Sequence, residues 1–194
     1  MGGEETREEI MDATYRALCA HGYASLTMQD IADECDRSKS LLHYHYDTKE
    51  DLLVALLNHL IERFDERIDL GEGAPRQQLV ELIDLFCFGD DREDHRAFHT
   101  ALLELRAQAP HNEAFRDQLR ANDARAEETI AAVIRQGIDT GQFRPVDADR
   151  TASHVISAIQ GARIRWVTLD HEAALVDVRE TLVENLVDDW LRAE

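Results

Sequence analysis

The polar side chains best suited to chemistry lie in one short stretch, residues 38–49. Ser38-Lys39-Ser40 combines two hydroxyls with an ammonium group, and His43-Tyr44-His45 adds imidazole and phenol groups. The chain has only two lysines, Lys39 and Lys49, and both fall in this stretch. Such groups at the start of a short helix can donate hydrogen bonds to phosphates and to base edges. The stretch therefore predicts contact with nucleic acid.

Two short helices joined by a tight turn would position these side chains. The spacing of apolar and capping residues predicts a helix over 27–34, a turn over 35–38 and a second helix over 39–46. Ser38 is a good N-cap for the second helix, because its hydroxyl can accept a hydrogen bond from a free backbone N–H group. This is the helix-turn-helix format, in which the start of the second helix approaches base edges in the major groove.

The rest of the chain is also helical in pattern. Apolar residues recur with the helical period, and threonine-led capping boxes begin at Thr6, Thr27 and Thr48. Gly22 is placed to stop the first helix. No convincing strand, internal repeat or low-complexity segment interrupts the pattern. We therefore predict an all-α fold of about nine helices, with a three-helix helix-turn-helix domain over 1–50 and a larger helical domain over 51–194.

The charge balance argues against ordinary binding to DNA. The 194 residues include 40 acids and 21 bases, a formal charge of −19, whereas affinity for a polyanion comes largely from Lys and Arg. Residues 1–50 alone carry 11 acids and 5 bases. Two lysines against 19 arginines on an acid-rich chain resemble the surfaces of halophile proteins, which work where about 1 M salt screens charge repulsion beyond about 3 Å. An ordinary acidic mesophile protein is the alternative.

The sequence carries no signal for a membrane or for secretion. No apolar run approaches the roughly 20 residues that span a bilayer, and the first residues lack the features of a signal peptide. The three cysteines, Cys19, Cys35 and Cys87, form no C-x-x-C pair. We expect a cytoplasmic protein.

Three segments, 27–32, 38–46 and 47–53, resemble the N-terminal signature of TetR-family transcriptional regulators. Gly22-Tyr23 and the helix before it fit the same pattern, so the resemblance covers roughly residues 7–57. It implies a homodimer whose N-terminal domains enter successive major grooves of a palindromic double-stranded DNA operator. It also implies that the larger domain dimerises and binds an unknown small-molecule effector, and it favours a repressor.

The resemblance assigns roles to individual residues of these segments. Those implied to face bases are Gln29, Lys39, Ser40 and Leu41, with Ser38 beside them at the helix start. Those implied to hold phosphates are Thr27, His43, Tyr44, His45 and Lys49, with Tyr44 and His45 able to reach a base. Two positions depart from the family pattern: Asp36 stands where the turn commonly has glycine, and His43 stands where a phosphate-binding tyrosine is usual.

The middle and last helices supply candidates for an effector pocket and a dimer interface. The pocket candidates, each of which could equally be plain core, are Phe86, Phe98, His99, Leu102, Phe115, Leu119, His154 and Trp166. The last two helices have a wider apolar arc than one core contact requires, which predicts a homodimer seam. Its residues are Val155, Ile159, Ala162, Trp166, Leu175, Val178, Leu182, Val183, Leu186 and Trp190. A final helix buried on two sides within one chain is the alternative.

No pattern indicates catalysis, a metal site or a cofactor. The nucleophile-elbow, zinc-protease and phosphate-loop motifs are absent from the sequence. His95 and His99 are four residues apart and share a helix face, which suits a solvated helix edge or a pocket rim better than a metal site. We therefore predict a ligand-responsive, DNA-binding transcriptional regulator. The alternative is an all-α dimeric small-molecule-binding protein whose DNA-reading domain is vestigial.

Overall fold

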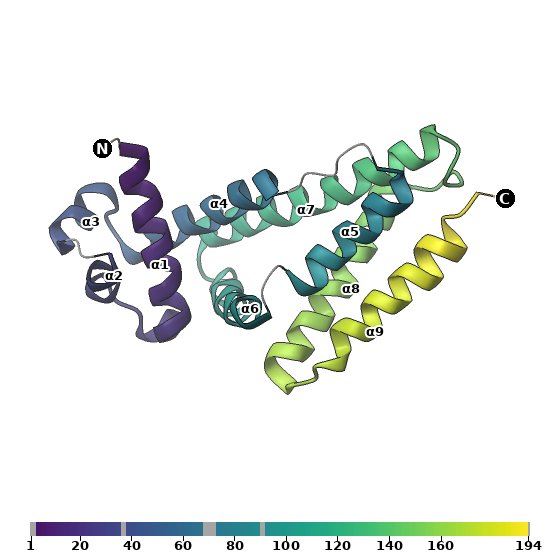
Figure 1. Ribbon diagram of the computed structural model, residues 1–194. Helices are drawn as coiled ribbons and strands as arrows, with labels where there is room; N and C mark the ends of the chain where they lie inside the picture. Colours follow the sequence, from purple (N-terminus) through teal and green to yellow (C-terminus); the bar gives the residue numbers. More distant parts are fainter. Residues whose placement is uncertain (1–2, 36–37, 68–72, 90–91, 194) are drawn as a thin grey trace. The chain divides into compact units, whose positions relative to one another are not determined.

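The computed structural model describes residues 3–35, 38–67, 73–89 and 92–193, and in these ranges the chain is helical, with no strand (Figure 1). The elements are α1 (Gly3–Ser25), α2 (Met28–Glu34), α3 (Lys39–His45), α4 (Lys49–Arg67), α5 (Pro75–Phe88), α6 (Arg92–Gln108), α7 (Glu113–Asp139), α8 (Ala148–Leu169), α9 (Ala173–Thr181) and the π-helix η1 (Leu182–Trp190). The prediction of an all-α fold with about nine helices is confirmed.

These elements divide into two compact units, each built from two separate parts of the chain. The first unit comprises Met1–Ile68 and Thr100–Asn122, and the second comprises Asp69–His99 and Asp123–Glu194. α6 and α7 therefore each contribute residues to both units. The division of function expected between residues 50 and 51 falls in the first turn of α4 and stays a prediction.

The first unit is held together by an apolar core to which α1, α2, α3, α4, α6 and α7 all contribute. Its members that are at most 1% exposed include Ile10 and Met11 on α1, Ile31 on α2, Leu42 on α3, Leu52, Leu53, Leu56 and Leu57 on α4, Leu105 on α6 and Phe115 on α7. Burying one such side chain stabilises a fold by about 1.5–3 kcal/mol. Through Leu42, Leu52 and Leu53 this core holds α3 and the start of α4 in the first unit.

α1 begins earlier than the sequence predicts and breaks where the sequence predicts. The helix starts at Gly3, so Thr6 lies inside it and does not cap it. Acidic residues near a helix start are favourable in themselves, which allows the helix to extend past the expected cap. Gly22 has φ +68° and ψ 160°, a conformation that breaks the helical path and that side chains rarely adopt. The boxes predicted at Thr27 and Thr48 both form.

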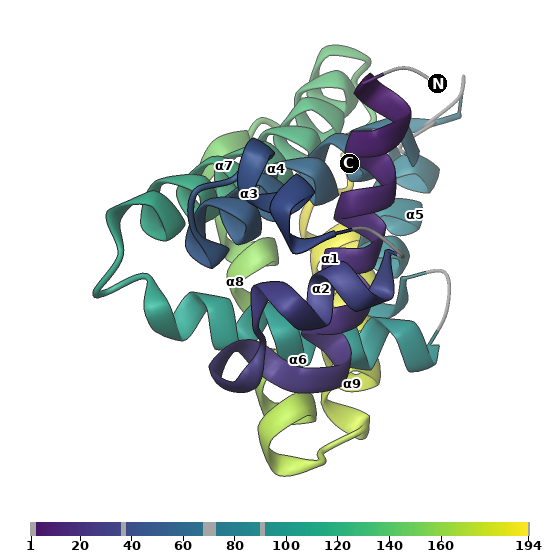
Figure 2. The same cartoon turned by 90° about the vertical axis from the view of Figure 1, so that its left-hand side faces the viewer.

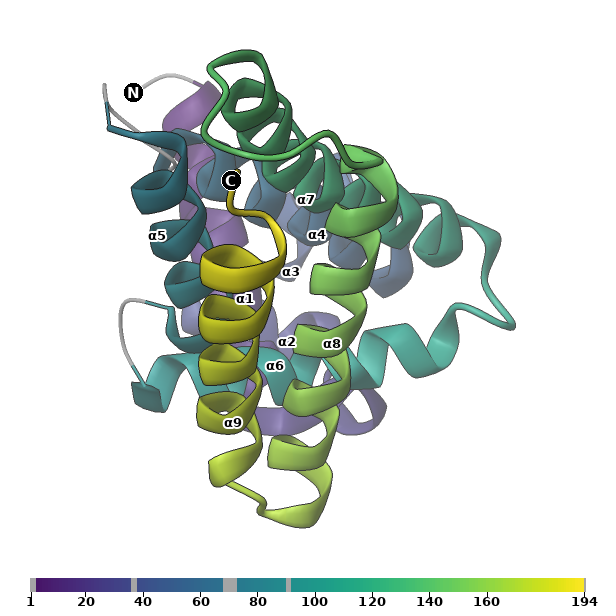
Figure 3. The same ribbon diagram turned by 90° about the vertical axis from the view of Figure 1, so that its right-hand side faces the viewer.

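In the second unit α5 packs against α8, α9 and η1, and α8 packs against α9. Figure 3 shows α8 and α9 side by side, with α5 on the other side of α9. Two bidentate ion pairs join α5 to the last helices. Arg179 donates to Asp84 at 2.7 and 3.1 Å, and Arg76 donates to Asp188 at 2.6 and 2.9 Å. The bonds from Arg76 lower the pKa of Asp188, and the paired geometry fixes the register of the helices.

Cys87 is fully buried in the second unit. Its burial raises the pKa of the thiol to about 11. Because the thiolate is the reactive form, this side chain is inert near neutral pH. Cys19 and Cys35 instead lie half-buried against the core of the first unit.

Two kinds of feature are absent from the described part of the chain. None of its helices has the length and apolar content needed to cross a membrane. The same residues include no group of three histidine, cysteine or carboxylate side chains that could hold a metal ion.

Candidate nucleic-acid interface

α2 and α3 form the helix-turn-helix pair that the sequence predicts, and both helices start with a side-chain cap. The Thr27 hydroxyl accepts from the backbone N–H of Asp30, and the Asp30 carboxylate accepts from the backbone N–H of Thr27 at 2.8 Å. The Ser38 hydroxyl accepts from the N–H of Leu41 at 3.3 Å. Figure 2 views this part of the molecule with α1, α2 and α3 towards the reader. Asp36, the expected departure in the turn, lies outside the described residues.

α3 is anchored by one side chain and presents the others to solvent. Leu42 is 0% exposed and packs into the core of the first unit, whereas Tyr44 is 82% exposed. The other predicted contact residues of α3 that are exposed are Lys39, Ser40, His43 and His45, with Ser38 exposed at the cap and Leu41 half-buried. A helix held in this way can enter a groove without disturbing its own core.

The two predicted contact residues of α2 are exposed, and each makes a bond within its own helix. The Thr27 hydroxyl donates to the Asp30 carboxylate at 2.7 Å, and Gln29 donates to Asp33 at 2.7 Å. The bonds from the Thr27 hydroxyl and amide lower the pKa of Asp30. A charged Asp30 therefore keeps the cap of α2 in place as the solution becomes acidic.

Lys49 is the predicted contact residue with the most unexpected surroundings. Its ammonium group donates to the carbonyl oxygen of Tyr23 at 2.9 Å and lies 4.4 Å from the centre of the Tyr23 ring. Tyr23 in turn has a raised pKa, because its hydroxyl is desolvated and lies beside Glu50. Lys49 thus joins the start of α4 to the end of α1. Sequence reasoning missed this internal bond because it links residues 26 apart.

In the second unit three predicted pocket residues, Phe98, His99 and Trp166, lie together with His95 in an aromatic cluster. The ring of His95 stacks on Trp166 with centroids 5.6 Å apart and meets His99 edge-on at 4.3 Å. Phe98 meets His99 at 4.8 Å. The guanidinium of Arg96 lies 5.6 Å from the centre of the Trp166 ring. The spacing of His95 and His99 was the available signal for this aromatic cluster.

An open hollow of about 500 Å³ adjoins the aromatic cluster through Gly89. Its lining residues are Asp84, Leu85, Phe88, Gly89 and Arg179. A Cβ atom at Gly89 would lie 2.5 Å from Nδ1 of His95, so the glycine and the ring are in close contact. Phe88 and Trp166 also pack against the same small apolar core of Ala162, Ala174 and Leu175.

The other pocket candidates lie apart from the aromatic cluster. Phe115 and Leu119 belong to the buried core of the first unit, and Leu102 packs against that core. His154 is exposed on α8 and donates to the carbonyl oxygen of Arg150 at 2.7 Å. Phe86 is buried on α5, where its carbonyl oxygen accepts a hydrogen bond from Arg163.

Most of the predicted seam residues face the interior of the single chain. Val155, Ile159, Ala162, Leu175, Leu182 and Val183 are at most 9% exposed, while Trp166, Val178 and Leu186 are half-buried. Trp190 is 42% exposed, with the guanidinium of Arg144 over its ring at 4.5 Å. Three further large apolar side chains on α8 and α9 are exposed: Ile164 at 47%, Leu169 at 70% and Val176 at 41%. The last helices therefore carry apolar side chains on two faces.

Two family profiles together match most of the chain. One describes bacterial regulatory proteins of the tetR family and matches residues 10–56. The other describes the C-terminal part of BetI-type transcriptional repressors and matches residues 75–192. The first match contains α2 and α3, and the second contains the aromatic cluster.

Individual relatives agree with both profiles. The HTH-type transcriptional regulator BetI of Rhizobium meliloti (strain 1021) is 27% identical over 192 residues, which cover 96% of this chain and 90% of that protein. A TetR transcription regulator from Haloarcula marismortui ATCC 43049 is 43% identical, with a TM-score of 0.89 over 97% of this chain and 100% of that chain. A transcriptional regulator from Saccharomonospora viridis, solved in complex with choline, is 25% identical, with a TM-score of 0.82 over 98% of this chain and 100% of that chain.

The two lysines should differ in what they do for the folded state. Lys49→Met removes a charged hydrogen bond to Tyr23, so we expect it to lower stability by about 1–2 kcal/mol, or about 2–8 °C in melting temperature. Lys39→Met removes the same charge from an exposed position and should leave the melting temperature within about 1 °C. Thermal unfolding followed by circular dichroism measures both, and equal shifts would contradict the internal role of Lys49.

Proposed function

Because the chain belongs to the TetR family of bacterial regulatory proteins, and so is a DNA-binding transcriptional regulator rather than an enzyme, we propose that it acts as a repressor. It binds a palindromic operator as a homodimer and leaves that operator when a small molecule binds the second unit. One observation carries the proposal: α3 is capped at Ser38 and anchored by Leu42, and it exposes Lys39, Ser40, His43, Tyr44 and His45 to solvent. That combination presents a rigid polar helix to a groove.

The exposed side chains suggest how the operator is read. Lys39 and Ser40 stand at the start of α3, where a recognition helix meets base edges, and Leu41 offers apolar contact to a thymine methyl group. Gln29 on α2 completes this base-facing set. Each of these residues lies within one turn of a capped helix start, so the backbone beneath it is fixed.

The residues around the base-facing set contact phosphates. Thr27, His43, Tyr44 and His45 are exposed and carry hydrogen-bond donors. Lys49 has three ammonium donors, so its bond to Tyr23 leaves donors for a phosphate.

The charge of −19 sets the conditions in which this interface works. In dilute buffer the acidic chain and the DNA backbone repel each other, whereas molar salt screens that repulsion and leaves short-range base contacts to carry affinity. We propose a halophilic source for the chain, which the 43% identity to the Haloarcula regulator supports.

Operator binding can be tested without knowing the operator. Selection from a genomic DNA library in about 1 M KCl should enrich a palindrome, and binding should persist as KCl rises from about 0.2 to about 1 M. Lys39→Met should weaken binding about 5- to 30-fold, because a base or phosphate contact is lost. Arg120→Met removes an equal charge from an exposed site on α7 in the same unit and should change affinity less than about twofold.

Two results would count against this function. A protein that enriches no sequence in high salt yet binds a small molecule would support the alternative with a vestigial reader. Equal losses in Lys39→Met and Arg120→Met would mean that α3 does not read the DNA.

We propose that the homodimer forms through α8, α9 and η1. The inward-facing seam residues hold these helices to α5 and to each other, and the outward-facing apolar residues Ile164, Leu169, Val176 and Trp190 meet a second copy. A seam of large apolar side chains from two helices per subunit is the kind of surface that obligate dimers bury.

The seam predicts the effect of placing a charge on it. Ile164→Asp and Val176→Asp should each convert the dimer to a monomer, because a carboxylate would be buried without a partner. Ala124→Asp introduces the same charge at an exposed position on α7 and should remain dimeric. Light scattering after gel filtration in high salt gives the mass, and dimeric seam variants would place the interface elsewhere.

We further propose that the effector is a small organic cation of the choline class. The C-terminal part matches BetI-type repressors, and the Saccharomonospora regulator was solved with choline. The aromatic cluster suits such a ligand, because aromatic ring faces attract quaternary ammonium groups. The guanidinium of Arg96 already lies over the Trp166 ring, and the ion pair of Asp84 with Arg179 lines the adjoining hollow. The volume of that hollow is in the range of small-molecule sites.

A neutral isostere separates the charge of choline from its shape. Calorimetry should detect choline binding to the dimer and much weaker binding of 3,3-dimethylbutanol, in which carbon replaces the ammonium nitrogen. Trp166→Leu should weaken choline binding about 3- to 30-fold, whereas Tyr44→Leu removes an exposed aromatic ring of the first unit and should bind choline as the wild type does. Equal affinity for the alcohol and the cation would exclude a cation-selective pocket.

A further inference from the structure

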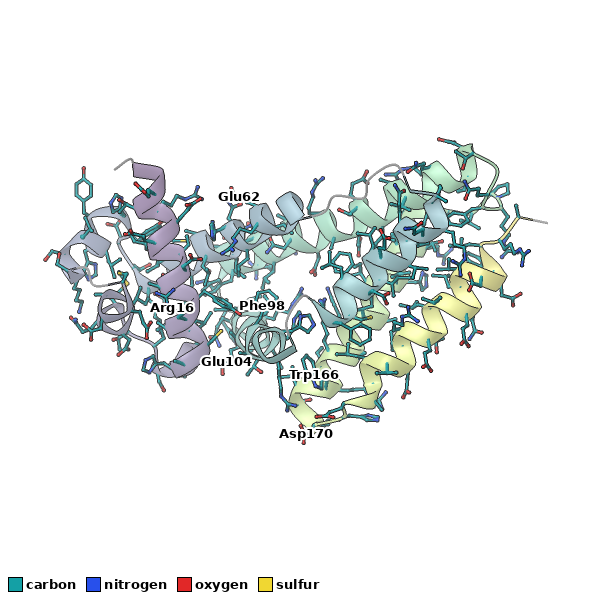
Figure 4. The ribbon with its side chains drawn as sticks, in the orientation of Figure 1. Arg16, Glu62, Phe98, Glu104, Trp166 and Asp170 are labelled. Carbon is teal, nitrogen blue, oxygen red and sulfur yellow. The ribbon has the colours of Figure 1, made fainter. Side chains whose placement is uncertain are left out.

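A carboxylate from α6 fills the break in α1. The backbone N–H of Tyr23 donates a hydrogen bond to Oε2 of Glu104. A Cβ atom at Gly22 would lie 3.0 Å from that same oxygen and 3.1 Å from Oε1, so the carboxylate lies where a side chain at position 22 would be. Figure 4 labels Glu104 on α6 beside the end of α1. The Glu104 carboxylate therefore caps the short helical turn that follows Gly22.

Tyr23, which Glu104 binds, also bonds to two residues of α4 in the first unit. The carbonyl oxygen of Tyr23 accepts from Lys49, and its hydroxyl donates to Glu50 at 3.3 Å. Its ring meets the ring of Phe115 edge-on at 6.1 Å. The amide of Tyr23 is thus hydrogen-bonded to α6, and its carbonyl oxygen and hydroxyl are hydrogen-bonded to the first turn of α4. α4 begins four residues after α3 ends.

From this chain of contacts we infer that Glu104 is a positioning residue for operator binding, acting through Tyr23 and Lys49 on the start of α4 and on α3. The inference rests on the proposed DNA-binding function, although Glu104 itself lies outside the interface. The carboxylate holds the Tyr23 peptide in one orientation, and that peptide holds the ammonium group of Lys49. Without the carboxylate, the half-buried break at Gly22 can relax and the start of α4 can shift.

Operator affinity tests the inference. Glu104→Ala should weaken operator binding about 5- to 30-fold, and Glu104→Gln, which keeps an acceptor oxygen, should lose less. Because Glu104 acts through Lys49, Glu104→Ala combined with Lys49→Met should bind no worse than the weaker single variant. Glu113→Ala is the matched control: it removes an equal charge from an exposed site at the start of α7 in the same unit and should leave operator affinity within about twofold.

Amide hydrogen exchange tests the inference without DNA. In Glu104→Ala, exchange should accelerate at Tyr23 and over residues 39–52, and it should stay unchanged in the second half of α7. Unchanged exchange over 39–52, wild-type affinity in Glu104→Ala, or additive losses in the double variant would each overturn the positioning role. If the wild type enriches no operator, the proposed function fails, and the exchange result still decides whether Glu104 positions α3.

Discussion

A helix of seven residues does not hold itself together in water, so the solvent-facing side chains of α3 depend on the interactions that keep this helix folded. Three local interactions do this: the cap at Ser38, the burial of Leu42, and the hydrogen bond from the N–H of Tyr46 to the carbonyl oxygen of Leu42 at 2.8 Å. Leu42 is the one fully buried side chain of α3. The side chain that anchors the helix and those that face solvent therefore occupy separate positions on it.

Most features that act over three or four residues could be predicted from the sequence, the cap expected at Thr6 being the exception, and features that join distant residues could not. The caps at Thr27 and Ser38 and the break at Gly22 depend on neighbours along the chain, and all three occur where the sequence indicates. Phe115 was a pocket candidate but lies in the core of the first unit. Its helix, α7, contributes residues to both units, and no local sequence pattern indicates which half of the helix belongs to which unit. The bonds of Tyr23 to Lys49 and Glu104 escaped prediction for the same reason.

Two kinds of basic group can be compared among the described residues of the first unit. Arg7, Arg16 and Arg63 form ion pairs with Glu62, Glu34 and Asp12, so their charges are offset by neighbours and add little to stability on an exposed surface. Lys39 is exposed at the start of α3, where a positive charge meets any approaching polyanion. An acidic protein can in this way keep local recognition chemistry while its overall field repels nucleic acid at low salt.

The inert thiol at position 87 has a practical consequence. Thiol-directed probes require a thiolate, so maleimide or nitroxide labels should leave Cys87 untouched and attach only to the first unit, at Cys19 or Cys35. Replacing either of those two by serine leaves one label per subunit without adding any cysteine. In a dimer, dipolar spectroscopy between the two labels would then measure the distance between the two first units.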